Sequence, residues 1–191
     1  MKAPAPFQSL KLHHYGALLV DPPWSFKTWS KRGEGRSAKR HYQTMTFDQL
    51  KVLPVQRVAA DDCVLFLWAT WPLLIEALLL MAWWGFEYKT CAFDWMKVGR
   101  EGFIPVIGTG YWTRANTEAC LLGTRGNPKR RDRGVAQAIL EPRREHSRKP
   151  DCVHLRIERL VAGPYLELFA RQRRKGWTTW GDQTTAFSGR G

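Results

Sequence analysis

The sequence predicts an α/β fold in which a mostly parallel sheet is covered by helices on both faces. Short runs of continuous apolar residues, such as 16–20 (GALLV) and 63–69 (CVLFLWA), are typical of strands that are buried on both sides. These runs alternate along the chain with segments of helical pattern. The chain has 191 residues, of which 44% are hydrophobic and 25% charged, so one domain with a substantial core is expected.

The first elements are indicated by local signals. The apolar run at 16–20 stops at the sequence DPP, which predicts a strand followed by a tight turn. Thr46 and Gln49 have the spacing of a capping box, so a short helix is expected to begin after Thr46. The run at 63–69 predicts a second buried strand.

The later elements follow from proline, glycine and apolar patterns. A helix is expected from Trp71, with Pro72 at its first position, to about Trp84, and Gly85 should end it. The pair Trp83 and Trp84 is expected in the core. The other expected elements are an extended segment at 86–97, strands at 117–123 and 135–140, a helix at 151–161 that stops before Gly163-Pro164, and a strand at 165–170.

The positive charge of the chain is clustered. The formal net charge is +13, and residues 27–40 contain six basic residues and one acidic, whereas residues 125–149 contain nine and three. Both blocks fall in weakly patterned segments. We expect these to be surface loops around the edge of the sheet where the strand at 16–20 ends. Nearby aromatic residues and the lack of an amphipathic basic helix favour nucleic acid over an anionic membrane. A generic basic surface is the alternative.

Membrane insertion, secretion and metal binding are not indicated. The first 16 residues lack the apolar core of a signal peptide, and the apolar stretch 72–84 is too short to span a bilayer and contains Glu76. The histidines and cysteines have no metal-ligand spacing, so we expect no metal site. We expect free thiols in the reducing cytoplasm at the four cysteines: Cys63, Cys91, Cys120 and Cys152.

The segment LLVDPPWSF, residues 18–26, places a carboxylate, two prolines and a tryptophan after the first strand. Ligands of parallel sheets bind beyond the carboxyl ends of the strands. The exocyclic amine of adenine is a weak nucleophile, because its lone pair is delocalised into the ring. Asp21 and the Pro22 carbonyl could accept hydrogen bonds from its two N–H groups, and Trp24 could stack on the base. A plain turn with a core tryptophan is the alternative.

Six further segments follow in order: HYQTMTFDQL, LFLWAT, ANTEACLLGTRG, REHSRKPD, LELFAR and WGDQ. With LLVDPPWSF they resemble the adenine-N6 methyltransferase family named after the seventy-kilodalton MT-A subunit of the mRNA methyltransferase, in particular its compact bacterial and phage members. The resemblance covers residues 18–183. It implies a Rossmann-like fold in permuted order, with the catalytic segment before the cofactor segments. It also implies S-adenosylmethionine as the methyl donor and adenine in DNA as the substrate.

The resemblance also implies roles for particular residues. Lys149 matches a lysine at the methionine part of the cofactor, Arg171 matches an arginine at the ribose, and Arg144 falls in the same gating segment as Lys149. The residues expected to be catalytic are Asp21, Pro22, Pro23 and Trp24. The residues expected to bind the cofactor are Asp21, Arg144, Lys149, Phe169, Arg171, Arg173, Arg174, Asp182 and Gln183.

The chain departs from the family at two of these places. Asp182 and Gln183 stand where the family has an Asn-Gln pair, so an amide donor to the adenosine would be lost at Asp182. Arg173 and Arg174 stand where the eukaryotic enzyme has a His-Asn pair. Gly108-Thr109-Gly110 lacks the third glycine of a dinucleotide signature, and we expect a loop beside the target base there.

Basic and aromatic residues in the loops are expected to contact nucleic acid. Tyr42 falls in the loop that closes over the target in the family. Tyr111 and Trp112 lie in a glycine-rich segment with Arg114, where base stacking and core packing are alternatives. The full expected set is Lys27, Lys31, Arg32, Lys39, Arg40, Tyr42, Tyr111, Trp112, Arg114, Lys129, Arg130 and Arg131.

Several alternatives stay open at this point. The substrate is expected to be DNA, with RNA as the runner-up and a non-catalytic nucleic-acid-binding partner as the third hypothesis. Glu118 could orient Lys149 or be an ordinary carboxylate at the end of a strand. We expect one domain over residues 1–191, with flexible ends at 1–14 and 185–191, and either a homodimer or a second subunit is possible.

Overall fold

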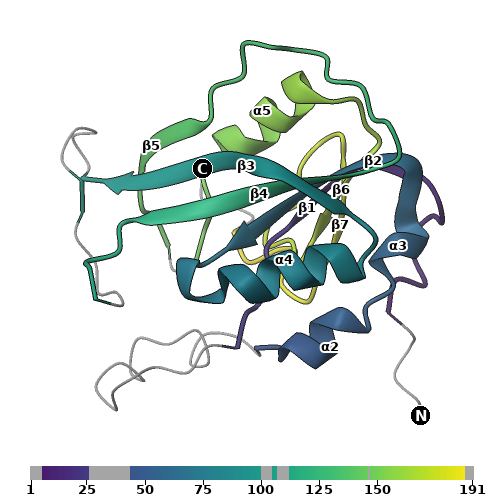
Figure 1. Cartoon of the computed structure of the whole chain (residues 1–191), viewed down its shortest axis with the longest axis horizontal. Coiled ribbons are helices and arrows are strands. Elements are labelled where there is room, and N and C mark those ends of the chain that lie inside the picture. The colour runs from purple at the N-terminus through teal and green to yellow at the C-terminus, as the bar shows by residue number, and fades with distance from the viewer. Residues whose placement is uncertain (1–5, 26–43, 100–104, 107–111, 146, 188–191) are drawn as a thin grey trace.

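One mixed sheet forms the centre of the molecule (Figure 1). The computed structural model describes residues 6–25, 44–99, 105–106, 112–145 and 147–187. Within this part of the chain the strands are ordered β5-β3-β4-β2-β1-β6-β7 across the sheet. Their bounds are β1 (Tyr15–Val20), β2 (Ala59–Ala69), β3 (Glu87–Val98), β4 (Thr117–Arg125), β5 (Ala138–Pro142), β6 (Tyr165–Leu168) and β7 (Trp177–Trp180).

Strand β4 is antiparallel to both of its neighbours, β2 and β3. The remaining pairs, β1 with β2, β1 with β6, β6 with β7 and β3 with β5, are all parallel. The carboxyl ends of the parallel strands therefore meet at one edge of the sheet, the carboxyl edge, and their starts meet at the amino edge. This arrangement confirms the expected Rossmann-like α/β class.

Helices cover both faces of the sheet (Figure 1). Alternate residues of β1 point to opposite faces, so Leu18 packs in the core on the side of α4 and Leu19 packs in the core on the side of α5. Both leucines are at most 3% exposed. The helical elements are α2 (Phe47–Lys51), α3 (Val55–Val58), the 3-10 turn η2 (Trp71–Leu73), α4 (Leu74–Trp83) and α5 (Cys152–Leu160).

Local signals position two helices as expected. The Thr46 hydroxyl accepts a hydrogen bond from the Gln49 N–H, and the Gln49 side chain accepts one from the Thr46 N–H, which is the predicted capping box at the start of α2. The helix expected from Trp71 starts as a 3-10 turn that contains Pro72. It ends at Trp83, and Gly85, just after the C-cap residue Trp84, has a φ of +80° that favours glycine, as expected for the stop.

Other expectations were wrong or incomplete. The strand expected at 135–140 is β5, three residues later, and β7 and α3 were not predicted. Trp84 is buried, but Trp83 is 58% exposed, so only one of the pair belongs to the core. In the described parts of the two ends that were expected to be flexible, Phe7 and Phe187 are buried (4% and 8% exposed) against aromatic or basic side chains, whereas most of their neighbours are exposed.

Two further properties concern the whole described chain. None of the helices formed by these residues is long and apolar enough to cross a bilayer. The four cysteines form no disulfide. Burial raises the pKa of Cys63 to about 12, so this thiol is protonated at neutral pH.

Candidate active site

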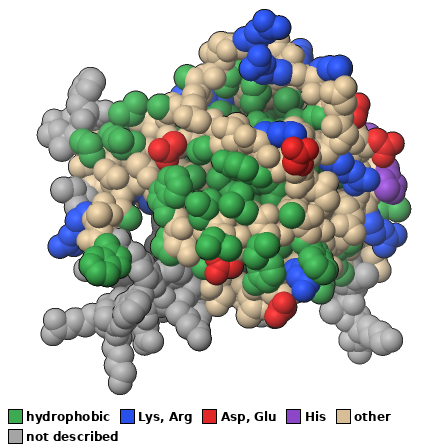
Figure 2. Space-filling model, in the orientation of Figure 1, with side chains coloured by type: hydrophobic (Ala, Val, Ile, Leu, Met, Phe, Trp, Pro, Cys, Tyr) green, Lys and Arg blue, Asp and Glu red, His purple; other side chains and the backbone are tan. Residues whose placement is uncertain are grey.

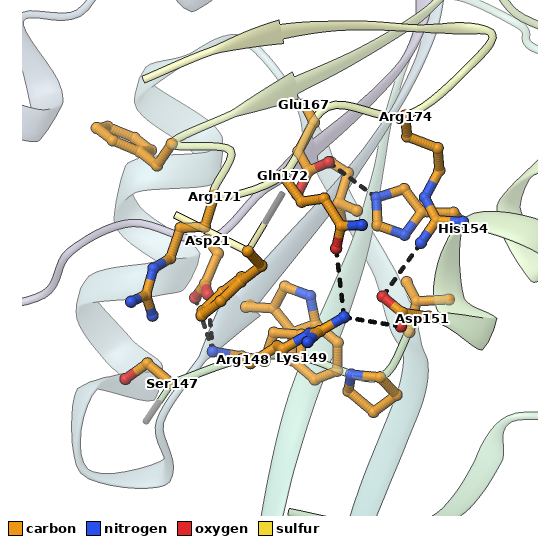
Figure 3. Close-up of a pocket in the computed structure, with 16 residues that line it drawn as sticks. Asp21, Ser147, Arg148, Lys149, Asp151, His154, Glu167, Arg171, Gln172 and Arg174 are labelled. Carbon is orange, nitrogen blue, oxygen red and sulfur yellow. Dashed lines mark hydrogen bonds and ion pairs between the residues drawn. The ribbon is translucent and has the colours of Figure 1, made fainter. Parts of the chain in front are cut away.

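Asp21 follows the last residue of β1 and so lies at the carboxyl edge. The turn after it is held by main-chain hydrogen bonds, from the Trp24 N–H to the Pro22 carbonyl (2.8 Å) and from the Met45 N–H to the Pro23 carbonyl (2.8 Å). The Trp24 indole N–H donates to the Trp68 carbonyl at 3.1 Å, near the end of β2. The DPPW segment is therefore fixed to the sheet, and its carboxylate faces a cavity (Figure 3).

Lys149 connects Asp21 to a second carboxylate. Its ammonium nitrogen lies 2.9 and 2.8 Å from the two Asp21 carboxylate oxygens and 3.4 Å from Glu118 Oε2. The other oxygen of Glu118 accepts from Lys97. Positive and negative groups thus alternate along this row. Of the two interpretations of Glu118, the contact favours a role in orienting Lys149.

The carboxyl groups of this row differ in acidity. Burial raises the pKa of Asp21, and the nearby Lys149 ammonium only partly opposes this effect. Burial also disfavours the charged form of Glu118, but Lys149 and Lys97 outweigh it and hold the pKa of Glu118 below its ordinary value. Asp21 is therefore the carboxylate of this row that becomes protonated first as the pH falls.

A second aspartate lies in the same cavity in a different environment. Asp151, just before α5, accepts from Arg144 (2.6 Å) and Arg148 (3.3 Å) at one oxygen and from Arg174 (3.1 Å) at the other. Partial burial opposes ionisation, yet the three guanidinium groups outweigh it and lower the pKa of Asp151. The Asp151 carboxylate is thus bound by arginine side chains and makes no capping hydrogen bond to α5.

The cavity combines charged groups with aromatic rings. Phe169, which follows β6 with a φ of +60°, and Phe187 line it, and the Arg171 guanidinium lies 4.5 Å from the centre of the Phe187 ring. The remaining lining residues are Leu19, Asp21, Trp68, Ser147, Arg148, Lys149, Pro150, Asp151, Val153, His154, Glu167, Gln172 and Arg174.

The lining fits a ligand with a charged amino-acid end and an aromatic end. Lys149 and Arg171 can bind a carboxylate, and the rings of Phe169 and Phe187 can contact a flat purine. Arg148 Nε is buried and has no hydrogen-bond partner among the residues described, so the cavity also offers a buried donor. These are the groups that S-adenosylmethionine requires.

The structure brings together about half of the expected cofactor residues. Asp21, Lys149, Phe169, Arg171 and Arg174 line the cavity. The other expected cofactor residues are not among its lining residues. Arg144 instead donates hydrogen bonds to the Asp151 carboxylate and to the Lys149 carbonyl. Those others are Arg144, Arg173, Asp182 and Gln183.

The expected nucleic-acid residues divide between the two edges of the sheet. Trp112 is fully exposed and Arg114 is exposed. Both precede β4, so they lie at the carboxyl edge with Asp21. This exposure excludes core packing for Trp112. Residues 129–131 follow β4 and lie at the amino edge, where the Arg131 N–H donates to the Leu160 carbonyl. The expectation that this second basic block surrounds the site was wrong for 129–131, because β4 runs antiparallel and carries the following loop away from Asp21.

The other expected nucleic-acid residues lie outside the residues that the structure describes. These are Lys27, Lys31, Arg32, Lys39, Arg40, Tyr42 and Tyr111.

Several cavity residues were not predicted. His154 Nε2 lies 2.8 Å from Glu167 Oε2, and both side chains are less than 20% exposed. A charged residue inside the apolar strand pattern YLELFA was the signal that could have identified Glu167. Gln172 bonds Arg148, and Phe187 was assigned to a flexible end. In the described ranges no group of three or more His, Cys, Asp or Glu side chains could hold a metal ion.

Comparisons with known proteins identify the family of the chain. The MT-A70 family model matches residues 15–183. The type II methyltransferase M.MunI from Mycoplasma sp is 35% identical over 193 residues, covering 92% of this chain and 80% of its own length. The N(6)-adenosine-methyltransferase catalytic subunit METTL3 from Homo sapiens and the METTL3 subunit from Danio rerio are each 30% identical over 177 residues, covering 90% of this chain. The chain spans only 28% of the length of these two relatives.

Proposed function

The chain belongs to the MT-A70 family of S-adenosylmethionine-dependent methyltransferases, and we propose that it methylates the exocyclic N6 amine of adenine in DNA. The observation that carries the proposal is the position of Asp21. Its carboxylate lies at the carboxyl edge of the sheet, faces a cavity with a suitable lining, and belongs to a turn fixed by its own main chain.

Asp21 and Pro22 are the groups that would hold the amine. The Asp21 carboxylate can accept one amine hydrogen. The Pro22 carbonyl accepts from the Trp24 N–H and has a second lone pair for the other hydrogen. Both acceptors draw the nitrogen lone pair out of conjugation with the purine ring. Proline has no N–H at this place, so no donor of residues 22 and 23 faces the amine.

Lys149 would keep Asp21 in position. It contacts both carboxylate oxygens, is itself held by Glu118, and lies 5.4 Å from the centre of the Trp68 ring. A carboxylate that is oriented before the substrate binds pays no reorganisation cost during the reaction. The aspartate is thus preorganised as an acceptor.

The cofactor would lie in the cavity next to Asp21. Lys149 and Arg171 could bind its carboxylate, and Phe169 and Phe187 its adenine, whereas Asp182, Gln183, Arg144 and Arg173 remain candidates only through the resemblance. When bound, S-adenosylmethionine supplies a methyl group that is already activated by a positively charged sulfur. The chain then needs to supply position and polarity rather than a covalent intermediate.

DNA is favoured as the substrate by the higher identity to a type II methyltransferase, 35% for M.MunI against 30% for METTL3. The net charge of +13 favours a nucleic acid of either kind. Trp112 and Arg114 at the carboxyl edge could contact an extruded base and a phosphate. The free thiols fit a reducing compartment, and we propose the cytoplasm.

RNA is the second candidate, because several relatives at 30% identity are N(6)-adenosine-methyltransferases. Matched DNA and RNA oligonucleotides, incubated with labelled S-adenosylmethionine and digested to nucleosides, decide between the two. We expect N6-methyladenine in DNA, and label in RNA alone would replace the proposal with the second candidate.

The same assay tests the role of Asp21. Asp21→Asn should lose transfer, whereas Asp61→Asn, an exposed aspartate at the amino edge, should behave as wild type. A folded wild-type protein that labels neither nucleic acid would contradict the proposed function.

A further inference from the structure

Helix α4 is apolar on nearly all sides, which is unusual for a helix at the surface. The segment Leu74–Trp83 (LIEALLLMAW) contains one charged residue, Glu76. Its inner residues Ala77, Leu80 and Met81 are fully buried against the sheet. A helix that is hydrophobic all round is normally covered on both sides.

The outer side of α4 carries a continuous apolar stripe. Ile75, Leu79 and Trp83 follow each other at intervals of four residues and are 72%, 56% and 58% exposed. Val52, just after α2, is 73% exposed. We call these four residues the α4 patch. Figure 2 shows hydrophobic side chains gathered over this helix. Exposed apolar side chains that occur singly need no explanation, but a contiguous patch indicates an interface.

The charges around the patch do not favour nucleic acid or an anionic membrane as its occupant. Asp48 and Glu87 lie beside the helix, paired with Lys51 (4.0 Å) and Lys89 (2.6 Å), and Glu76 lies on the helix itself. The rim therefore has three acidic and two basic groups in a chain of net charge +13. The net charge of two copies is repulsive, so a contact between them is least opposed at a face where acidic and basic groups nearly balance, as they do here.

We propose that the α4 patch binds the α4 patch of a second copy of this chain in a two-fold symmetric dimer. Leu79 lies four residues from both Ile75 and Trp83, so an antiparallel crossing at Leu79 places Ile75 of each copy near Trp83 of the other. Each apolar side chain of the stripe on α4 then meets an apolar partner.

The charges fit the same register. The Lys51 ammonium lies 4.2 Å from the centre of the Trp83 ring, at one end of the stripe. Glu76 is adjacent to Ile75, at the other end, and forms no ion pair with any described residue. The crossing that pairs Ile75 with Trp83 brings Glu76 of one copy toward Lys51 of the other. The patch is therefore self-complementary in its charges as well as in its apolar side chains. The inference is independent of the proposed function.

Sedimentation velocity over a wide range of protein concentrations tests the dimer. Wild type should form a dimer, and Leu79→Glu, which places two carboxylates face to face at the two-fold axis, should raise the dissociation constant at least about 100-fold. Leu155→Glu is the matched control, because Leu155 is a leucine on α5 that is 59% exposed. It should leave the dimer intact. A wild type that stays monomeric, or a dimer insensitive to Leu79→Glu, overturns the proposal.

Charge reversal provides a test that does not depend on the folding of Leu79→Glu. Glu76→Lys and Lys51→Glu should each weaken the dimer, and the double variant should recover most of the lost affinity, because its reversed charges still face each other. Two single variants without effect, or a double variant weaker than both, would contradict the assigned register. Circular dichroism of every variant verifies that it is folded.

Discussion

Asp21 and Asp151 line the same cavity but are surrounded differently. Asp21 has one ammonium partner and a raised pKa, whereas Asp151 has three guanidinium partners and a lowered one. A carboxylate offers about four acceptor positions, and the arginines occupy most of those of Asp151. The difference separates two tasks: Asp151 ties α5 to neighbouring loops, and Asp21 keeps capacity for a substrate hydrogen.

The largest difference is expected from removing each carboxylate in turn. Asp21→Asn should lower the single-turnover rate of methyl transfer by at least about 100-fold, because an acceptor aimed at the reacting amine is lost. Calorimetric titration with S-adenosylmethionine should show nearly unchanged affinity. Asp151→Asn should leave the rate of the chemical step within about tenfold of wild type, since Asp151 does not touch the amine. Equal loss of rate in both variants would remove the distinction between the two aspartates.

The second largest effect is expected from removing the Lys149 ammonium beside Asp21, and it concerns the pH dependence of the rate. Lys149→Met removes the ammonium that favours the ionised carboxylate, so the pKa of Asp21 should rise further and the acid limb of the pH–rate profile should move to higher pH. Lys97→Met is the matched control, because Lys97 contacts Glu118 rather than Asp21. It should move the limb less. An unchanged limb in Lys149→Met would show that Lys149 does not control Asp21.

The free energy of unfolding is expected to fall more in Asp151→Asn than in Asp21→Asn. Asp151→Asn leaves three arginines without their anionic partner and should lower the free energy of unfolding by about 1–3 kcal/mol at neutral pH. Asp21→Asn should cost less, since it removes a carboxylate that burial disfavours. Chemical denaturation of both variants at equal pH measures the difference, and a larger loss in Asp21→Asn would contradict it.

The smallest effect is the pH dependence of stability, and its sign differs for the two groups. The pKa of Asp151 is lowered by folding, so its contribution is present above the ordinary value of 3.8 and is lost as the pH falls through the lowered pKa. The pKa of Asp21 is raised by folding, so the folded state binds the proton more tightly and stability falls as the pH rises from 3.8 through the raised pKa. Melting temperatures measured across this range should therefore show opposite trends: relative to wild type, Asp151→Asn should lose its stability deficit as the pH falls, whereas Asp21→Asn should gain stability as the pH rises through the raised pKa of Asp21.

The sequence predicted what local signals determine. The strand before Asp21, the capping box at Thr46 and the stop at Gly85 depend on neighbouring residues, and the structure contains all three. The ordered family segments also led to the MT-A70 family and its fold, which the family match confirms.

Features that depend on topology could not be predicted in this way. Lys149 is 128 positions from Asp21, and no spacing predicts that their side chains meet. The place of residues 129–131 depends on the direction of β4, which an apolar run does not reveal. Strand β7 is a four-residue edge strand, WTTW, too short for its pattern to be distinguished from a loop.

The most direct test of the catalytic assignment is a crystal structure of the protein with S-adenosylhomocysteine and DNA that contains its target adenine. The account predicts that an Asp21 carboxylate oxygen and the Pro22 carbonyl oxygen each lie within about 3.2 Å of the adenine N6 atom. An adenine amine bound by other groups, with Asp21 still paired only to Lys149, would contradict it.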